Sequence, residues 1–493
     1  FNTHLTIDKV ESDIYNISNL HLVNITLNDT LYFRTIFKGG KEKTEDFDLS
    51  FYHTFNNDNK FVVGIQKSNV NFKNNDWILN PEDNLSNNII YDNKSKNYII
   101  NPFVIASGNQ NIQFLGEVNG ATSTDLKFKF KDVQLANVTP NIDSLNLEGI
   151  INGSLNYSKK KKLVKPTGNL VISNFNINNS YQGDLKIDVE GNSTTAYNFD
   201  VSLLRNELLS LKGTGLIDFE PKDPTIEATI VFNEFKLDAF SPLGEDVLTN
   251  IRGLAYGEAA LSGLLENPKM EGDLFLDNAG IYIPFLNVDY NFLGTSVIGL
   301  NNQTFSFDDV TLSDNLKNTK AELTGTIKHK GFDNWLLDLN INTRNLLVLN
   351  TEEIENSLYY GTAFMEGLAT IKGPTDELVI NLEGKTKKGT HFVIPISDIK
   401  TADESQILRF VSKNTNEKVE EERRAFISEK LKGLEMSFNM EITKDAVVEM
   451  VLDKATGSFL KGSGTGNLQI NLDMKDKFEM YGGFNVDNGI YNF

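Results

Sequence analysis

The sequence predicts an all-β fold, made of a quasi-repeating series of strands with a few short helices. The first observation is the alternation of apolar and polar residues, which is strict at residues 126–130, 185–189 and 337–341. One apolar and one polar face is the pattern of a half-buried strand. The second observation is that clusters of Asn, Asp and Gly, as at 56–59 and 178–180, separate these runs. Such residues tolerate the backbone conformations of turns, so we expect roughly twenty to thirty strands.

The composition limits the classes of function open to the chain. Its 493 residues carry 47 Lys and Arg against 67 Asp and Glu, a net charge of −20 at pH 7, and 40% of them are hydrophobic. This hydrophobic content is sufficient for folding, while the excess of negative charge opposes a partner held through phosphates. We therefore expect no nucleic-acid partner. Because the chain has no cysteine, disulfides, thiolate metal sites and cysteine nucleophiles are excluded.

No arrangement of residues indicates catalysis. The five histidines have no His or carboxylate partner at the spacing of metal ligands. The glycine run at 462–466 lies between extended segments, without a following helix whose N-terminus could bind phosphate. Neighbouring carboxylates are expected by chance in so acidic a chain. We therefore expect no enzymatic activity, no metal and no cofactor.

Internal repetition predicts how the strands are organised. Residues 168–174, followed by Ile177, share spacing and polarity with residues 272–278, followed by Ile281, and residues 466–471 are a partial third copy. The copies lie about 100 residues apart, too far for solenoid turns of roughly 20 to 50 residues. Each repeat must therefore hold several strands. A sheet that grows along one axis fits this better than separate domains, because no Pro/Ser/Gly linker divides the units.

One segment departs from the strand pattern. Apolar residues flank a charged stretch between residues 404 and 432, with Asp403 suited to begin a helix and Gly433 to end it. We expect a helical insertion at about 404–432. No stretch has the roughly 18 to 20 consecutive apolar residues that a membrane-spanning helix needs. We expect any anchoring segment to lie outside this chain, as part of a longer protein.

The alternation leaves two architectures open. Two packed sheets would form a sandwich or solenoid with a filled core. One sheet curled into a trough would leave an apolar interior that needs a ligand to cover it, because a large exposed apolar surface promotes aggregation. A lipid would serve, since a two-tailed lipid exposes roughly thirty methylenes to water at about 0.8 kcal/mol each.

From Gly253 onward the sequence resembles the TamB family, which belongs to the AsmA-like repeating β-groove proteins of diderm bacterial envelopes. The order and density of short motifs carry the resemblance, and the first half of the chain matches only in its strand pattern. The motifs are Tyr256-Gly257 with Ala259, Asn267-Pro268, Gly272-x-Leu274, Ala279-Gly280-x-x-Ile283-Pro284-Phe285-Leu286 with Tyr290, Trp335-Leu336-Leu337-Asp338-Leu339, Asn345-Leu346-Leu347-Val348-Leu349-Asn350-Thr351, Leu358-Tyr359-Tyr360-Gly361-Thr362-Ala363-Phe364, Gly373-Pro374, Gly389-Thr390-x-Phe392-x-Ile394-Pro395, Met480-Tyr481-Gly482 and Gly489-Ile490-Tyr491-Asn492-Phe493.

The resemblance implies an elongated, twisted, open β-groove, or β-taco, with an apolar interior. It implies a location in the periplasm of a diderm bacterium, bridging the inner and outer membranes. The implied partners are phospholipid, an outer-membrane barrel protein of the TamA type, and the inner membrane through an anchor absent from this chain. The implied role is to carry phospholipid between the membranes and to support outer-membrane protein assembly, within the translocation and assembly module. We accordingly expect residues 1–252 to be the N-terminal part of the groove and residues 253–493 to be a TamB-like groove.

Two sets of candidate functional residues follow. The lipid-groove candidates are apolar residues of the alternating runs and repeats, namely Leu170, Ile172, Leu274, Leu276, Ile281, Ile283, Leu339 and Ile341. The partner-docking candidates lie in the last segments, where a sheet edge with unpaired backbone groups can add a strand from another chain. They are Phe484, Val486, Ile490, Tyr491 and Phe493.

Two other kinds of protein use the same pattern. A secreted β-solenoid adhesin or glycan-binding protein has similar alternation and turns, and a row of exposed aromatic side chains along one face would favour it. An outer-membrane β-barrel is suggested by the alternation and by the terminal Phe493. It is opposed by the expected helix at 404–432 and by strands often shorter than the roughly 9 to 11 residues of a membrane crossing.

Overall fold

The computed structural model describes most of the chain. Described are residues 2–493 apart from 12–14, 41–44, 74, 121, 140–145, 161–162, 192, 194, 245–247, 331–332, 354–358, 396–434, 455 and 474–476. The helical insertion expected at 404–432 lies outside the described residues.

The described residues form an almost wholly β structure. They include 31 strands, slightly more than the sequence led us to expect. The two helices are short, the α-helix α1 (Leu135–Val138) and the 3-10 helix η1 (Leu237–Gly244). The prediction of an all-β chain with a few short helices is confirmed. Within the described part of the chain, no helix has the length and apolar character needed to span a bilayer.

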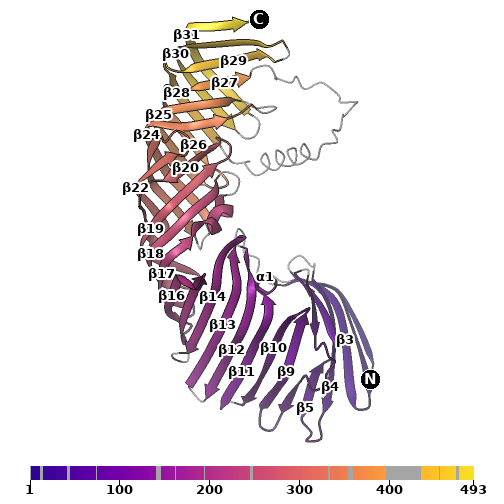
Figure 1. Ribbon diagram of the computed structural model, residues 1–493. Helices are drawn as coiled ribbons and strands as arrows, with labels where there is room; N and C mark the ends of the chain where they lie inside the picture. Colours follow the sequence, from indigo (N-terminus) through magenta and orange to yellow (C-terminus); the bar gives the residue numbers. More distant parts are fainter. Residues whose placement is uncertain are drawn as a thin grey trace, which may run out of the picture. The chain divides into compact units, whose positions relative to one another are not determined.

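The chain divides into two compact units, which are described separately. Unit 1 comprises residues 1–230 and 262–265, and unit 2 comprises residues 231–261 and 266–493. In Figure 1 the strands of unit 1 run from indigo to magenta and those of unit 2 from magenta to yellow. Strand β17 (Thr225–Lys236) begins in unit 1 and ends in unit 2, and most of β18 (Thr249–Leu264) belongs to unit 2.

Unit 1 is an antiparallel ladder in every strand register described for it. Strand β4 pairs with both β5 and β6. From there β5 pairs with β8 and β6 with β7, and both β8 and β7 pair with β9. Between the long strands β4 and β9, short strands therefore lie end to end in pairs, β5 with β6 and β8 with β7. The strands are β1 (Thr3–Val10), β2 (Ile17–Leu27), β3 (Thr30–Gly39), β4 (Glu45–Phe55), β5 (Phe61–Ile65), β6 (Ser68–Phe72), β7 (Asn75–Leu79), β8 (Asn88–Asp92), β9 (Asn97–Ser107), β10 (Gln110–Asn119), β11 (Ser123–Gln134), β12 (Leu147–Lys160), β13 (Leu163–Ile177), β14 (Ser180–Gly191), β15 (Ala196–Arg205) and β16 (Leu208–Asp218).

The register of unit 1 collects apolar side chains on one face of the sheet. Leu170 on β13 lies opposite Ile187 on β14, which lies opposite Val201 on β15. Between these positions the polar face carries pairs such as Asn169 and Asp188, whose side chains are hydrogen-bonded at 2.6 Å. The alternation in the sequence therefore corresponds to a sheet with one apolar and one polar face.

Unit 2 combines antiparallel ladders with two parallel pairs. Its strands are β19 (Asn267–Ile283), β20 (Val288–Phe292), β21 (Ser296–Asn302), β22 (Thr304–Asp314), β23 (Lys320–Lys330), β24 (Asp333–Thr351), β25 (Tyr360–Pro374), β26 (Val379–Thr386), β27 (His391–Pro395), β28 (Glu435–Ile442), β29 (Val447–Asp453), β30 (Ser458–Asp473) and β31 (Lys477–Asn492), besides most of β18. Strand β26 runs parallel to β28, and β27 runs parallel to β29. Residues 396–434 connect β27 to β28, and this connection is longer than the dozen or so residues that a parallel crossover requires.

A β-bulge lies at the same place in two copies of the sequence repeat. Asn174 and Asn278 have φ angles of +53° and +50°, a conformation that Asn adopts more readily than most residues. At Asn174 the β13–β14 register shifts between Ile172 and Phe175. At Asn278 strand β19 exchanges its partner β21 for β20. Because a bulge inserts one extra residue, the apolar side chains before and after it stay on the same face.

Candidate functional site

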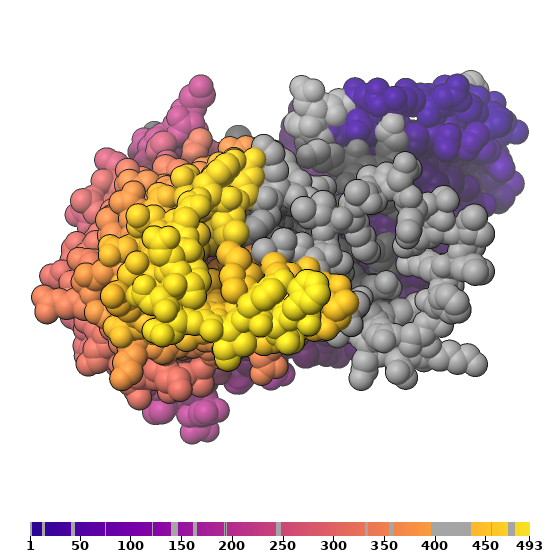
Figure 2. Space-filling model, turned by 90° about the horizontal axis from the view of Figure 1, so that it is seen from above, coloured from indigo at the N-terminus to yellow at the C-terminus, as the bar shows by residue number. Residues whose placement is uncertain are grey.

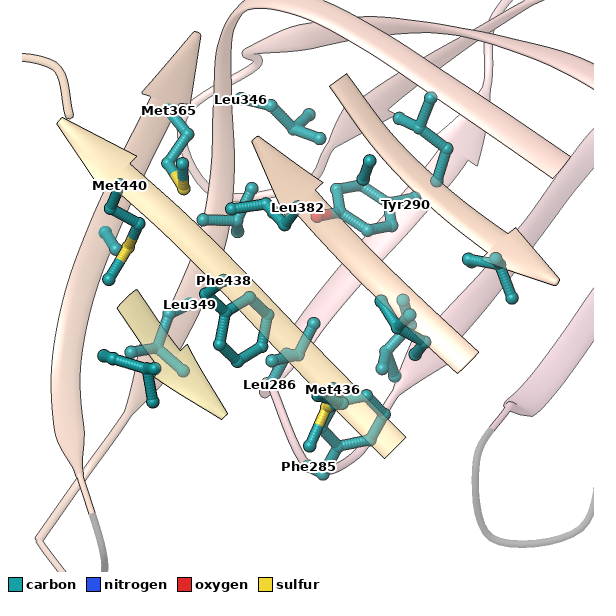
Figure 3. A pocket seen from close by; sticks show the side chains of 18 of the residues that line it. Phe285, Leu286, Tyr290, Leu346, Leu349, Met365, Leu382, Met436, Phe438 and Met440 are labelled. Carbon is teal, nitrogen blue, oxygen red and sulfur yellow. The ribbon is translucent and has the colours of Figure 1, made fainter. Parts of the chain in front are cut away.

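An apolar cavity with a volume of about 190 Å³ lies within unit 2 and is partly open to solvent. Its walls come from β19, β20 and β22–β28, with further contributions from β29, β30 and neighbouring turns, and Figure 3 shows 18 of the lining side chains. The lining residues are Leu248, Ile281, Ile283, Phe285, Leu286, Tyr290, Leu312, Leu323, Leu337, Leu339, Ile341, Leu346, Val348, Leu349, Tyr359, Ala363, Met365, Ala369, Ile371, Leu378, Ile380, Leu382, Thr386, Thr390, Phe392, Met436, Phe438, Met440, Ile442, Ala446, Val448 and Ile470.

Hydroxyl groups on the lining are bonded to the protein itself. The Tyr290 hydroxyl donates a hydrogen bond of 2.7 Å to the backbone oxygen of Leu347. Thr390 Oγ1 donates to the backbone oxygen of Phe364 at 3.1 Å, and Thr386 Oγ1 accepts from the backbone N–H of Thr443 at 2.9 Å. These hydroxyls therefore gain nothing by turning towards a ligand, and the surface that the cavity offers is hydrocarbon.

Burial also determines the protonation of the two tyrosines in the wall. It raises the pKa of Tyr359 to about 12. Burial, with the nearby charge of Asp314 as a second cause, raises the pKa of Tyr290 still further. Both phenols are therefore neutral in the physiological range, and the cavity carries no charge on its lining.

The strands of the wall keep their charges on the opposite face. Leu339 on β24 lies opposite Ile371 on β25, and both line the cavity. The neighbouring pair in the register, Asp338 and Lys372, forms an ion pair of 3.1 Å between exposed side chains on the other face. Because successive side chains of a strand point to opposite faces, the same pair of strands builds an apolar wall and a charged exterior.

On the charged face, two acidic side chains form ion pairs with residues of neighbouring strands and turns. Glu366 on β25 lies 3.3 Å from Lys385 and 2.8 Å from Lys387, and hydrogen bonds from Lys387 and Lys385 lower the pKa of Glu366. Glu449 on β29 accepts from His391 on β27 and from Lys461 on β30, each at 2.9 Å. Burial by itself raises the pKa of Glu449, but these hydrogen bonds lower it overall.

Four of the eight groove candidates lie at this cavity, and four lie elsewhere. Ile281, Ile283, Leu339 and Ile341 line it. On the same strand as Ile281, but before the bulge at Asn278, Leu276 is buried and Leu274 packs against a cluster of Ala259, Met270 and Leu300. Leu170 and Ile172 belong to unit 1, where Ile172 is buried and Leu170 half-buried on the apolar face.

The five docking candidates lie on β31 and at the residue after it. Val486, Ile490, Tyr491 and Phe493 are exposed, whereas Phe484 packs against a cluster formed by Ile442, Ala446, Val448 and Leu468. The only strand register described for β31 is with β30. In Figure 2 the yellow C-terminal residues lie at the surface that faces the viewer.

Sequence reasoning missed the second wall of the cavity. Met436, Phe438, Met440 and Ile442 on β28 all line it. Their strict alternation with polar residues in the sequence was a usable signal. It was missed because β28 directly follows the segment for which a helix was expected.

A comparison with protein families identifies part of the chain. Residues 308–493 match the family model described as the TamB C-terminal domain, and all but six of the cavity-lining residues fall within this match. A comparison with curated proteins finds no match. A TamB domain indicates a role in the translocation and assembly module of the cell envelope, and the family is a non-enzymatic transport and assembly component. This match supports a TamB family assignment for the segment 308–493.

Proposed function

We propose that the chain is a lipid-conducting groove protein of the periplasm, which moves phospholipid between the inner and outer membranes and supports outer-membrane protein assembly. The observation that carries the proposal is the cavity of unit 2, where the hydroxyls of Tyr290, Thr386 and Thr390 are bonded to the protein backbone and charged side chains lie on the far face of the wall. A ligand for such a surface must itself be hydrocarbon. The match to a TamB domain supports the same conclusion.

The size of the cavity decides how much of a lipid it would hold. An engineered apolar cavity of about 150 Å³ binds benzene, so a cavity of about 190 Å³ suits a stretch of one acyl chain and not a whole two-tailed lipid. Each methylene that leaves water contributes about 0.8 kcal/mol. We therefore propose that the head group stays outside in solvent while the chain moves along the wall.

The remaining parts of the groove and its attachments belong to the same proposal. Leu170 and Ile172 are proposed to line the groove within unit 1, and Leu274 and Leu276 within unit 2. Residues 1–252 and 253–493 are then two parts of one groove. Among the strand registers described, β31 pairs with β30 alone, and its other edge suits strand addition by an outer-membrane barrel of the TamA type. The inner membrane is the second proposed partner.

One feature of unit 1 favours the glycan-binding alternative. Its apolar face carries stacked aromatic pairs, including Phe33 with Phe51 at 5.2 Å and Phe37 with Phe47 at 4.5 Å between ring centroids. A glycan would also need polar groups beside the rings to bond its hydroxyls. The residue between Phe47 and Phe51 on that face is Leu49, so lipid remains the better match.

Site-specific photo-crosslinking tests the proposed function. A photoreactive residue at Leu339 points into the cavity, whereas one at Asp338 points away from it, so the two form a matched pair on one strand. We expect phospholipid adducts from position 339 and none from position 338 when the protein is labelled in cells and analysed by mass spectrometry. Equal labelling of both positions, or adducts of glycan alone, would contradict the lipid groove.

A further inference from the structure

Methionine is concentrated at the cavity. Three of the seven methionines in the chain line it, Met365 on β25 and Met436 and Met440 on β28. Met365 and Met436 are 4% and 5% exposed, so they are part of the packed wall. Figure 3 labels all three among the side chains that line the cavity.

A glycine separates two of these methionines across the sheet. Gly384 on β26 pairs in register with Met440 on β28, and the methyl carbon of Met365 on β25 lies 3.1 Å from where a Cβ of residue 384 would stand. Because Gly384 has no side chain, the Met365 methyl group packs where that side chain would stand, and the backbone oxygen of Glu366 also lies close to this position. The unbranched side chain of Met365 therefore fits against the backbone of β26 beside the residue that pairs with Met440.

Other residues of the lining are stiffer. The ring of Tyr290 is fixed by the hydrogen bond from its hydroxyl to Leu347, and Leu312 is almost completely buried. Ile281 is β-branched and has few rotamers. Methionine has three rotatable side-chain bonds and a polarizable sulfur, so it fills irregular gaps. The lining of the cavity therefore combines fixed side chains with adaptable ones.

We propose that Met365, Met436 and Met440 determine which acyl chains the cavity accepts, and that they allow it to hold both straight saturated chains and chains bent by a cis double bond. This inference rests on the proposed function, because it names the range of ligands of the same cavity. A bent chain needs a different outline from a straight one, and the methionines change rotamer to refill the space that each shape leaves.

The test replaces flexible side chains by stiff ones of similar volume. The variant M365L/M436L/M440L keeps the wall apolar, and because exchanges of Met for Leu conserve volume and are well tolerated in protein cores, the fold is expected to persist. The matched control is M270L/M450L, since neither Met270 nor Met450 lines the cavity. A fluorescent fatty acid bound to the full purified chain is displaced by palmitate or by oleate, and the ratio of the two affinities is measured.

We expect the wild type and the control to bind palmitate and oleate within about threefold of each other, a difference of about 0.7 kcal/mol. The triple leucine variant should lose about tenfold more affinity for oleate than for palmitate, because leucine cannot reshape the wall. Protein in which norleucine, an unbranched analogue without sulfur, replaces methionine should keep the wild-type ratio.

The possible results distinguish a failure of the methionine proposal from a failure of the proposed lipid-groove function. An unchanged ratio in the triple leucine variant, with both acids still bound, overturns the role of the methionines and leaves the lipid groove intact. A changed ratio in the norleucine protein also overturns the argument from flexibility. Failure of the wild type to bind either acid overturns the proposed function and this inference with it.

Discussion

Asn287 and Asn350, which lie 63 residues apart, are joined through the backbone of Asn350. The Asn287 side chain donates from Nδ2 to the Asn350 carbonyl oxygen at 2.6 Å, and the Asn350 N–H donates to the carbonyl oxygen of Leu286 at 3.0 Å. The Tyr282 hydroxyl donates to Oδ1 of Asn287 at 2.8 Å. The turn between β19 and β20 is thus tied to the end of β24, and it brings Phe285 and Leu286 into the cavity wall.

Removing the side chain of Asn287 should loosen this link. Its φ of +51° would strain alanine, so glycine is the substitution that isolates the hydrogen bonds. We expect N287G to lower the free energy of unfolding by about 1 to 3 kcal/mol, measured by urea denaturation. N302G is the control, since Asn302 also has a positive φ but is exposed, and a loss as large as that of N287G would contradict the prediction.

A charge inside the cavity should block lipid while the same charge outside should not. L339E places a carboxylate on the apolar wall, where it loses hydration without gaining a partner. L336E places one at a position that is 45% exposed on the same strand. We expect lipid recovered with the purified protein, measured by mass spectrometry, to fall at least tenfold in L339E and to stay unchanged in L336E. Equal lipid content in the two variants would argue against the cavity as the binding site.

The ion pairs of Glu449 should make stability depend on pH in a defined direction. The pKa of Glu449 is lower in the folded protein than its ordinary value, so its contribution is present above that ordinary value and is lost as the pH falls through the folded one. We expect E449Q to be less stable than wild type by about 1 kcal/mol at pH 7, after allowance for solvent screening.

The difference between E449Q and wild type should shrink as the pH is lowered to 3, because the lowered pKa of Glu449 means that its carboxylate takes up a proton, and its contribution is lost, only at acidic pH. Denaturation midpoints in urea at the two pH values are the measurement. E383Q, an exposed change on β26, is the control. A difference that persists unchanged at pH 3 would mean that shape and not charge is responsible.

Asp314 should be essential to the turn that follows β22. Its carboxylate accepts hydrogen bonds from the backbone N–H groups of Leu316, Lys317 and Thr319 at 2.9, 2.6 and 2.6 Å. Burial alone would raise the pKa of Asp314, but a hydrogen bond from the Thr319 hydroxyl, together with these backbone bonds, lowers it overall. We expect D314A to cost about 2 to 4 kcal/mol, measured by thermal and urea unfolding. D308N, at an exposed position of the same strand, should change stability by less than about 0.5 kcal/mol.

The edge of β31 should bind another chain if it is the docking segment. Cysteines at Asn485 and Asn492 are exposed on this strand, and the absence of native cysteine keeps the background of crosslinking low. We expect disulfide crosslinks, formed in cells with an added oxidant, to cysteines introduced along an edge strand of an outer-membrane barrel of the TamA type. A cysteine at Asn342 on β24, which pairs on both sides with β23 and β25, should form none. Crosslinks from 485 and 492 only to further copies of this chain would contradict the docking role.

Only a small part of the cavity lining could be predicted from local pattern alone. The alternation at residues 337–341 placed Leu339 and Ile341 on one face, and in the structure both lie at the cavity. On β19, simple alternation would put Leu276 and Ile281 on opposite faces, because they are five residues apart. The bulge at Asn278 brings them to the same face, and the repeat in the sequence had grouped them without revealing the bulge. A single Asn with a positive φ angle cannot be recognised from the sequence, because Asn is frequent throughout this chain.

The sequence by itself determined that this chain is all-β, because a period of two residues is a local property that each strand expresses alone. Its motifs also determined the resemblance to the TamB family, which the match over residues 308–493 supports. Only the tertiary structure decided that β26 and β28 run parallel, with Val379 opposite Glu435, and that β25 and β28 share one cavity. Pairing between strands 56 residues apart depends on which apolar faces can be buried together, and that choice is made by the whole sheet and not by any one segment.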